Sequence, residues 1–506
     1  MAFIRYIIKN NGNEYASLLE TNRKGGCVKQ KYIKNLGRVI DKENGIFQNR
    51  ENGIFRYTLE NGYIDLPAIY KEKTKKERLI LDFGDSFFLY QYIRNQIFND
   101  AFYKILPEHT DSLLSLIFYK ILTDKKAYCY ADMWWQGNYV SILFPNAKLT
   151  SQRISELLVI IGSEDIQRKF FIEYYRLIYG TQNVTGILID SSGLPNSTKM
   201  SVTQISNHNG DINLEARLIY VIDRKSGMPI YFRYCAGNII DVTTLCTTLA
   251  ELRHYHIDID YAVLDAGYYS EVNIKELYQN NIKFITRLAP NRTLFKEVVA
   301  KCLPDLLTST NVIRYGNRLL YVRKMPILLC DYVGFAYVGI DMDSRNQQMK
   351  KTIFAALDDK LSKDDIDNKI AKLGVFVIVS SEDVKTEEIL PLYYTRQQIE
   401  QVFDVGKNNA DLLPLRVQNE NTFRGHLMIT FLATIILQKL QRDIITKSNK
   451  KDKINPEGAF ISLRNQKCKV YEDEIVPQEA VKSINDVYKL FKIIVPISLC
   501  KNCSEN

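Results

Sequence analysis

The sequence predicts a mixed α/β protein built around one mixed sheet, with a smaller β unit and a helical module beside it. Three observations support this prediction: strand-like runs gather after Thr185, apolar residues recur at helical spacing before it, and Asn-Gly turns punctuate residues 1–66. The 506 residues exceed what one hydrophobic core usually supports, so several structural units are expected.

The first part of the chain shows two different patterns. Residues 1–66 alternate polar and apolar positions between Asn-Gly pairs, and the charged run 71–78 follows. Residues 1–78 are therefore predicted to form a β-hairpin unit and a basic linker. Residues 79–180 carry apolar residues at helical spacing, as in FFLYQYIRNQIF, and predict a helical module. Charged runs of this kind are most often linkers or solvated helix faces.

From Thr185 the pattern changes to short strand-like runs separated by helical segments. The order is GILIDSSG, ARLIYVIDRKSG and MPIYFRYCAG, then a helical TTLCTTLAELRHYH, then YAVLDAG, another helix and KFITRL. Three strands, a crossover helix and further strands imply a mixed sheet with helical cover, which is the order of the RNase H-like fold. We expect the core at residues 181–304 and 373–445, a β-rich insertion subdomain at 305–372, and a C-terminal tail at 446–506.

Composition sets few limits on function. The 67 Lys and Arg against 58 Asp and Glu give a net charge of +9, which would attract a polyanion, although an ordinary basic protein explains it more simply. The nine cysteines are scattered, as reduced thiols of a cytoplasmic protein would be. The longest apolar stretch, within 426–440, is too short to span a bilayer and predicts a buried helix, so no membrane partner is expected.

Two aspartates follow apolar runs that are typical of buried strands. Asp190 follows residues 186–189 and precedes Ser-Ser-Gly, so the strand is expected to end there, and Asp265 follows residues 261–264 in the same way. Sites in α/β sheets form at the carboxyl ends of strands, and on parallel neighbours the two carboxylates would lie about 5 Å apart. Like charges that close favour a bound cation. Each aspartate alone is also explained as a turn or cap residue.

The third element is the segment 391–415, PLYYTRQQIEQVFDVGKNNADLLPL. At roughly 100° per residue, four polar side chains fall within about 60° on one face of a predicted helix: Tyr393, Arg396, Glu400 and Lys407. The apolar side chains of Ile399, Val402 and Phe403 fall on the adjoining sector, which would anchor the helix on the sheet and aim Glu400 at the aspartates. A solvated amphipathic helix with salt links is the alternative explanation.

Asp241 is a further acidic candidate. It precedes the predicted helix that begins TTL, and an N-cap is the simplest role for an aspartate there. The alternative is that its carboxylate approaches the site of the other two aspartates.

Taken together, these residues resemble the DDE insertion-sequence transposases, which carry a Y-x2-R-x3-E-x6-K signature around a catalytic glutamate. The signature is complete here, and GILIDSSG and YAVLDAGYYSEVNIKEL resemble the two aspartate motifs of the family. The opening YASLLETNRKGGCVKQKYIKNLGR resembles the family's N-terminal hairpins, and FRGHLMITFLATIIL resembles the helix after its glutamate. The likeness is best over residues 1–80 and 180–445.

The resemblance implies a transposase of a bacterial insertion sequence, which binds the terminal inverted repeats and catalyses DNA cleavage and strand transfer in cut-and-paste transposition. Asp190, Asp265 and Glu400 would be the catalytic residues and the ligands of two Mg²⁺ ions, for which Mn²⁺ can substitute. Three further side chains would bind the phosphates of the terminal nucleotides: Tyr393, Arg396 and Lys407.

The same resemblance implies the partners and the place of action. The partners would be double-stranded DNA, both as transposon ends and as target, and a second copy of the chain in a synaptic homodimer. Residues 79–180 would be a helical DNA-binding module, and the protein would act in the cytoplasm on the nucleoid.

Two other functions fit parts of the pattern. A decayed or domesticated relative would bind DNA ends without catalysis, and the intact set of three acids argues against it. A carboxylate-based hydrolase such as a glycosidase would also use paired acids. It predicts no dependence on Mg²⁺, however, and leaves Arg396 and Lys407 without a role.

Overall fold

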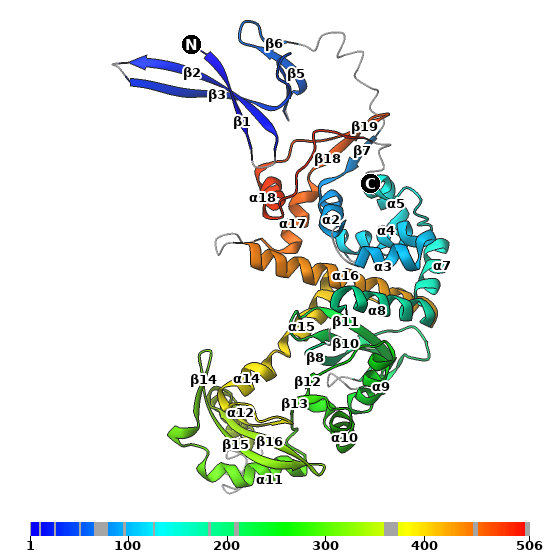
Figure 1. Ribbon diagram of the computed structural model, residues 1–506, viewed down its shortest axis with the longest axis vertical. Helices are drawn as coiled ribbons and strands as arrows, with labels where there is room; N and C mark the ends of the chain where they lie inside the picture. The colour runs from blue at the N-terminus through cyan, green and yellow to red at the C-terminus, as the bar shows by residue number, and fades with distance from the viewer. Residues whose placement is uncertain are drawn as a thin grey trace. The chain divides into compact units, whose positions relative to one another are not determined.

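The fold is taken from a computed structural model of the chain (Figure 1). The structure describes residues 2–9, 12–24, 27–49, 52–64, 79–94, 98–124, 127–180, 184–206, 212–358, 373–448 and 454–500. The predicted charged connector, residues 71–78, lies outside these ranges. The chain divides into two compact units: Met1–Ile160 with Asn409–Asp411 and Ile436–Asn506, and Ile161–Asn408 with Leu412–Ile435.

The first unit begins with a six-stranded antiparallel sheet whose strands follow chain order. They are β1 (Ala2–Ile8), β2 (Glu14–Lys24), β3 (Cys27–Asp41), β4 (Ile46–Asn49), β5 (Gly53–Thr58) and β6 (Gly62–Ile64). Three of the predicted Asn-Gly pairs lie at hairpin turns, where Gly45, Gly53 and Gly62 have φ of 65°, 63° and 66°. Glycine adopts these values without strain, which is why Asn-Gly marks tight hairpins.

A second sheet in this unit joins segments from both ends of the chain. Its order is β20-β19-β18-β7, so the strand that follows the connector pairs with strands of the predicted C-terminal tail. The strands are β7 (Leu79–Asp82), β18 (Lys467–Val470), β19 (Glu474–Pro477) and β20 (Leu499–Cys500). The segment after residue 446 is therefore folded over its described residues, because backbone pairing with β7 incorporates it into a sheet.

Helices make up the remainder of the first unit. They are α2 (Gly84–Arg94), α3 (Phe98–Ile105), η1 (Pro107–His109), α4 (Thr110–Leu122), η2 (Tyr128–Tyr130), α5 (Ala131–Gln136), α6 (Val140–Leu143), α7 (Ser151–Ile161), α17 (Pro456–Arg464) and α18 (Lys482–Leu490). Helix α4 is the central one, because all but one of its residues are buried.

A buried ion pair attaches the short segment Asn409–Asp411 to α4. The Lys120 ammonium lies 2.6 Å from Asp411 Oδ2, and the two side chains are only 3% and 6% exposed. Lys120 also donates to the Asp411 carbonyl oxygen at 3.3 Å and lies over the Tyr128 ring. Removing one member of such a pair leaves the other charge buried without compensation.

The second unit contains a ten-stranded mixed sheet of order β11-β10-β8-β12-β13-β17-β16-β15-β14, with β9 paired to β10. Its strands are β8 (Ile187–Pro195), β9 (Gln204–Ser206), β10 (Asn213–Asp223), β11 (Pro229–Ala236), β12 (Tyr261–Leu264), β13 (Lys283–Arg287), β14 (Val312–Tyr315), β15 (Arg318–Leu329), β16 (Tyr332–Asp341) and β17 (Val375–Ser380). Strands β8, β12 and β13 are parallel, and the other paired neighbours are antiparallel. This arrangement confirms the predicted RNase H-like mixed sheet, and β14–β16, from the expected insertion, extend that same sheet.

Helices complete the second unit, to which α16 contributes its residues up to Ile435. They are α8 (Glu164–Tyr179), α9 (Asp241–His254), η3 (Ala266–Tyr268), α10 (Glu271–Gln279), α11 (Thr293–Cys302), η4 (Leu303–Asp305), η5 (Ser309–Asn311), α12 (Met342–Asp358), α14 (Thr386–Tyr394), α15 (Gln397–Asp404), the π-helix η6 (Val405–Asn409) and α16 (Glu420–Lys447). Figure 1 shows α9 and α10 next to one another on one side of β8 and β12, and α15 on the other side. Helix α16 contains the apolar stretch 426–440, which is largely buried as predicted. No helix among the described residues has the length and apolar character needed to cross a bilayer.

We predict that Lys120→Ala lowers the free energy of unfolding by about 3–5 kcal/mol, because the Asp411 carboxylate would remain buried without its partner. Thermal or urea unfolding of the full chain measures the change. Arg153→Ala is the matched control, since Arg153 pairs with Glu156 at the surface of the same unit and its loss should cost about 0.5 kcal/mol or less. Equal effects of the two substitutions would contradict the role given to the buried pair.

Candidate active site

The two predicted aspartates lie next to one another at the edge where β8 and β12 meet. In the parallel pairing of these strands, Ile189 is the partner of Leu264, and each aspartate is the next residue along its strand. Asp265 directly follows β12 and precedes the helical turn η3, as expected. The side chains are partly accessible, at 16% exposure for Asp190 and 38% for Asp265.

The prediction that the strand ends at Asp190 is wrong. Strand β8 continues to Pro195 because β10 pairs with it along its whole length. Its other neighbour, β12, pairs only as far as Ile189, so Asp190 lies where the sheet loses one strand on one side. The carboxylate is therefore partly accessible although its backbone remains part of a strand.

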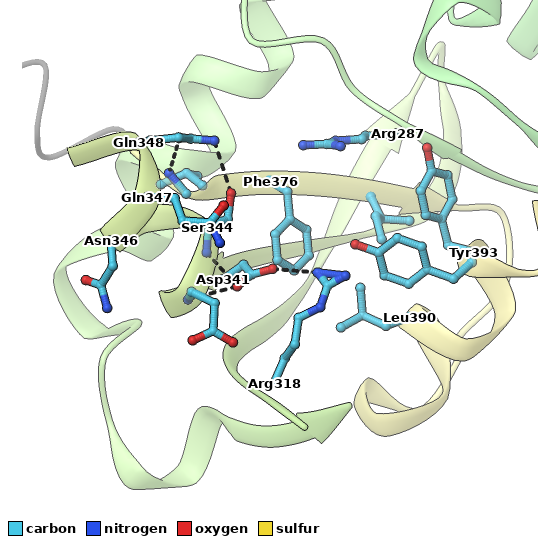
Figure 2. Close-up of a pocket in the computed structure, with 15 residues that line it drawn as sticks. Arg287, Arg318, Asp341, Ser344, Asn346, Gln347, Gln348, Phe376, Leu390 and Tyr393 are labelled. Carbon is cyan, nitrogen blue, oxygen red and sulfur yellow. Dashed lines mark hydrogen bonds and ion pairs between the residues drawn. The ribbon is translucent and has the colours of Figure 1, made fainter. Parts of the chain in front are cut away.

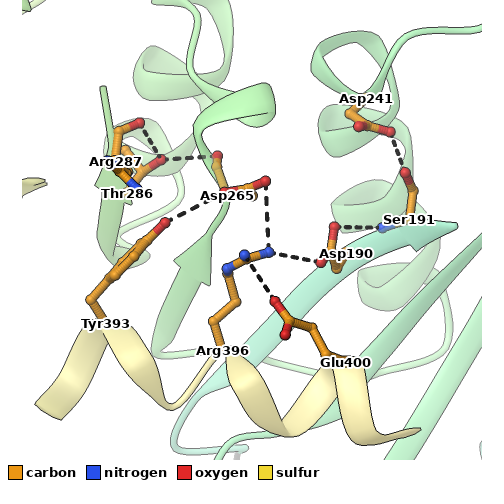
Figure 3. Close-up of polar contacts among 9 residues, drawn as sticks. All are labelled: Asp190, Ser191, Asp241, Asp265, Thr286, Arg287, Tyr393, Arg396 and Glu400. Atoms are coloured by element: carbon orange, nitrogen blue, oxygen red, sulfur yellow. Dashed lines mark hydrogen bonds and ion pairs between the residues drawn. The ribbon is translucent and has the colours of Figure 1, made fainter. Parts of the chain in front are cut away.

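The predicted helical stripe consists of two short helices and a π-helix. Helix α14 ends at Tyr394 and α15 begins at Gln397, but Thr395 and Arg396 keep helical backbone angles, with φ/ψ of −54°/−20° and −55°/−29°. The Arg396 N–H donates to the Tyr393 carbonyl oxygen, which is the tighter bonding of a 3₁₀ turn. The stripe thus keeps the same direction through the break, and Tyr393, Arg396 and Glu400 all face the aspartates (Figure 3).

Apolar side chains hold α15 in place, as the sequence predicts. Ile399 and Val402 are fully buried, and Phe403 is 7% exposed. The Phe403 ring stacks on Tyr220 of β10, with centroids 4.9 Å apart. Glu400, on the other side of the helix, is 57% exposed and free to face the aspartates.

The Arg396 guanidinium lies among the three predicted catalytic carboxylates (Figure 3). Its Nη1 is 2.9 Å from Asp190 Oδ2 and 3.6 Å from Asp265 Oδ2, and its Nη2 is 3.1 Å from Glu400 Oε1. Burial lowers the pKa of this guanidinium, but the surrounding carboxylates reverse the effect, and the net shift is upward. Three acids from β8, β12 and α15 therefore share one cation.

The charged form of the Asp190 carboxyl group is disfavoured by its surroundings. Burial raises the pKa of its carboxyl group to about 6, against the opposing effects of the Arg396 guanidinium and of the Ser191 N–H, which donates to Asp190 Oδ1 at 2.8 Å. The neighbouring Asp265 and Asp241 carboxylates add to the rise. A buried carboxylate among other carboxylates favours an added positive charge.

The other two residues of the signature take different positions. The Tyr393 hydroxyl donates to Asp265 Oδ1 at 3.4 Å, and burial, followed by the Asp265 charge, raises its pKa. Lys407 lies in the π-helix η6 and donates to Ser192 Oγ at 2.6 Å. Burial lowers its pKa, and the nearby Glu215 opposes this. Ser192 is two residues beyond Asp190 and thus points to the same face of β8. The Lys407 ammonium therefore contacts the face of β8 that carries the first aspartate.

Asp241 has a different role from the N-cap that the sequence favoured. Ile240 occupies the N-cap of α9 without a side-chain hydrogen bond, and Asp241 is the first helical residue. Its Oδ1 accepts from Ser191 Oγ at 2.5 Å and from Arg217 Nη1 at 2.9 Å. These hydrogen bonds lie on the face of β8 opposite to Asp190, where they hold the Ser191 side chain in place.

Ser191, Ser192 and Arg217 were not predicted as site residues. The two serines directly follow Asp190, and had β8 been expected to continue, the alternation of a strand would have assigned them to its two faces. Nothing in the local sequence distinguishes Arg217 from other strand arginines, since its partner is 24 residues away.

The donor set of the three acids fits a hard divalent cation, because it consists only of carboxylate oxygens. Over the described ranges, no three Asp, Glu, His or Cys side chains are gathered as closely as a bound metal ion requires. Here the Arg396 guanidinium lies between the acids and sets one positive charge against three carboxylates. A metal ion would enter as this guanidinium moves away.

Comparisons with known proteins bear on the family of the chain. A family model described as the transposase DDE domain matches residues 185–436, which include all three acids and the whole signature. Among solved structures, the chain is similar to piggyBac transposase in a cryo-EM synaptic complex with hairpin DNA, with 10% sequence identity and a TM-score of 0.40 over 70% of each chain. No curated protein sequence matches.

The chain therefore belongs to the DDE transposases. A domain of this family implies a metal-dependent polynucleotidyl transferase and endonuclease that acts on DNA. Residues 4–57 match the N-terminal domain of the IS1634 family of transposases, which identifies the chain further as an insertion-sequence transposase.

We predict that Arg396→Ala lowers the stability of the metal-free protein and increases its stabilisation by Mn²⁺ or Mg²⁺. Without the guanidinium the three carboxylates repel one another, and an added divalent ion meets no competing cation. A ligand at about 100 times its dissociation constant stabilises the folded state by about 2.7 kcal/mol, which thermal unfolding with and without metal detects.

Lys169→Ala serves as the control, because Lys169 is an exposed residue of α8 that pairs with the equally exposed Asp165 one helical turn earlier. It should leave the metal-dependent shift unchanged. An Arg396→Ala protein whose metal-dependent shift is no larger than that of wild type would contradict the assignment of the metal to these acids.

Proposed function

We propose that this transposase binds the terminal inverted repeats of its insertion sequence and uses Mg²⁺ to cleave them and to join them to target DNA. The observation that supports this most directly is the convergence of Asp190, Asp265 and Glu400 on one cationic group. These acids come from segments of the chain that lie far apart, and convergence of this kind is what a shared cation produces. The glycosidase alternative receives no support from the family match.

Asp190, Asp265 and Glu400 would hold two Mg²⁺ ions, for which Mn²⁺ can substitute. When bound, such ions activate a water or 3′-hydroxyl nucleophile and stabilise the leaving oxygen of an in-line displacement at phosphorus. The protein's own contribution is to hold the three carboxylates together where β12 ends beside β8, before any DNA arrives.

The cationic residues of the signature would bind the DNA backbone. Arg396 presents a planar fork that suits bidentate phosphate binding, so a DNA phosphate can replace the carboxylates as its partner. Lys407 would contact a second phosphate as a point charge, and Ser192 holds its ammonium in position meanwhile. Tyr393 would orient the Asp265 carboxylate, and its hydroxyl would donate a hydrogen bond to the same DNA strand.

Two ends must be held together for transposition, so we propose a homodimer in the synaptic complex, acting on the bacterial nucleoid in the cytoplasm. The helical segment 79–180 remains our candidate for a DNA-binding module. Size-exclusion chromatography with and without end DNA tests the dimer.

We expect Asp265→Asn and Glu400→Gln each to reduce DNA cleavage to background while end binding stays within a few-fold of wild type. Each change removes a charged metal ligand without changing the size of the side chain. The assay is Mg²⁺-dependent cleavage of DNA carrying the inverted repeat found beside the gene. The matched control is Glu382→Gln, since Glu382 pairs with Lys283 outside the site. Cleavage by both triad variants at the wild-type rate would refute the assignment.

Lys407→Ala should weaken end binding modestly and reduce the dependence of log Kd on log salt concentration by about one, as the loss of one phosphate contact does. A salt titration of binding, in EDTA so that no cleavage occurs, measures this. Lys225→Ala, in the exposed turn between β10 and β11, should change neither quantity. If both variants behave alike, Lys407 makes no phosphate contact.

A further inference from the structure

A third charged residue lies at the same edge of the sheet as the two aspartates. Arg287 is the last residue of β13, the strand next to β12. In this parallel pair Leu264 is the partner of Thr286, so Asp265 and Arg287 are the next residues on neighbouring strands. The Thr286 hydroxyl also donates to the Asp265 carbonyl oxygen at 3.2 Å, which ties the two strand ends together (Figure 3).

Arg287 differs from the other cations around the site in its contacts. Arg396 is held by the three acids, Lys407 by Ser192, and Arg318 by Asp341 at 2.8 Å. The Arg287 side chain is exposed, and within the described ranges no carboxylate lies at ion-pair distance from its guanidinium. The positive charge of Arg287 acts on the Tyr393 hydroxyl, where it lowers the pKa against the raising effect of burial.

A pocket of about 730 Å³ opens beside Arg287 (Figure 2). Its lining combines two arginines, two acids and aromatic rings, and includes Arg287, Arg318, Asp341, Asp343, Tyr393 and Tyr394. Tyr393 separates this pocket from Asp265 and touches both, since its hydroxyl bonds to that carboxylate. The volume is within the range of about 300–1,000 Å³ that small-molecule sites occupy, so the pocket can take a group the size of one nucleotide.

We propose that Arg287 binds a phosphodiester of the DNA strand next to the one cut at the three acids, where the strand passes Tyr393 into this pocket. An exposed arginine without a carboxylate partner is available for bidentate phosphate binding at no cost in broken ion pairs. This inference rests on the proposed function, because it takes DNA as the substrate of the same site. It adds a DNA-binding residue outside the Y-x2-R-x3-E-x6-K signature.

Binding of end DNA to the full chain in EDTA tests the proposal. Arg287→Ala should weaken binding roughly tenfold at low salt and make the salt dependence shallower by about one. Arg287→Lys keeps the charge but not the fork, and should fall between wild type and alanine. Arg323→Ala is the matched control: it removes an arginine of β15 that pairs with Asp305 and does not line the pocket, and it should bind as wild type does.

Neutral methylphosphonates, placed one at a time beside the cleavage position, then locate the contact. At one position the methylphosphonate should weaken binding by the wild type but leave the affinity of Arg287→Ala unchanged. A purely structural role of Arg287 would not produce this outcome. The inference is overturned if Arg287→Ala and Arg323→Ala agree in affinity and salt dependence, or if no position shows this loss of sensitivity.

Different outcomes test the proposed function and the role of Arg287. Wild-type protein that binds and cleaves its ends with Mg²⁺, together with an Arg287→Ala protein like the control, rejects only the role of Arg287. Wild-type protein that binds the ends but does not cleave them with any divalent ion rejects the proposed catalysis, while the binding data still decide on Arg287. Wild-type protein that does not bind the ends rejects both.

Discussion

The arrangement of the site depends on the ion pairs between the Arg396 guanidinium and three carboxylates. Asp190 and Asp265 emerge from adjacent parallel strands, so their charges are close by construction of the sheet. Glu400 is brought to them by a helix whose apolar side is buried on the same sheet. A single cation shared by all three offsets a repulsion that would otherwise oppose folding of the metal-free protein. A metal ion at the proposed site would have to displace this guanidinium.

Much of this site is predictable because it depends on local pattern. Apolar runs of four residues identify β8 and β12, and an acid directly after such a run lies at the strand end or close to it. The spacing of Tyr393, Arg396 and Glu400 survives a break between two helices, because the connecting residues keep helical angles. The Asn-Gly turns of the N-terminal sheet are predictable for a similar reason, since positive φ is a property of the dipeptide itself.

The features that escaped prediction depend on partners distant in sequence. Strand β8 extends beyond Asp190 only because β10 continues to pair with it. The residues of β8 themselves do not indicate this pairing. The direction of the Arg396 side chain, and the contact of Lys407 with Ser192, are set by groups more than 200 residues earlier in the chain. Asp241 shows the same limit: its position before a helix suggested a cap, whereas Arg217 and Ser191 engage its carboxylate.

The ten-stranded sheet has a consequence for the segment between the core strands. Because β16 pairs with β17 at six successive positions, and β15 and β14 continue outward from it, hydrogen bonds run without interruption from the strand of the first aspartate to the sheet margin. This segment cannot rotate as an independent lobe without breaking backbone pairs. Trimming it away would uncover a full row of N–H and C=O groups along β17, an open edge of the kind that recruits strands from other molecules.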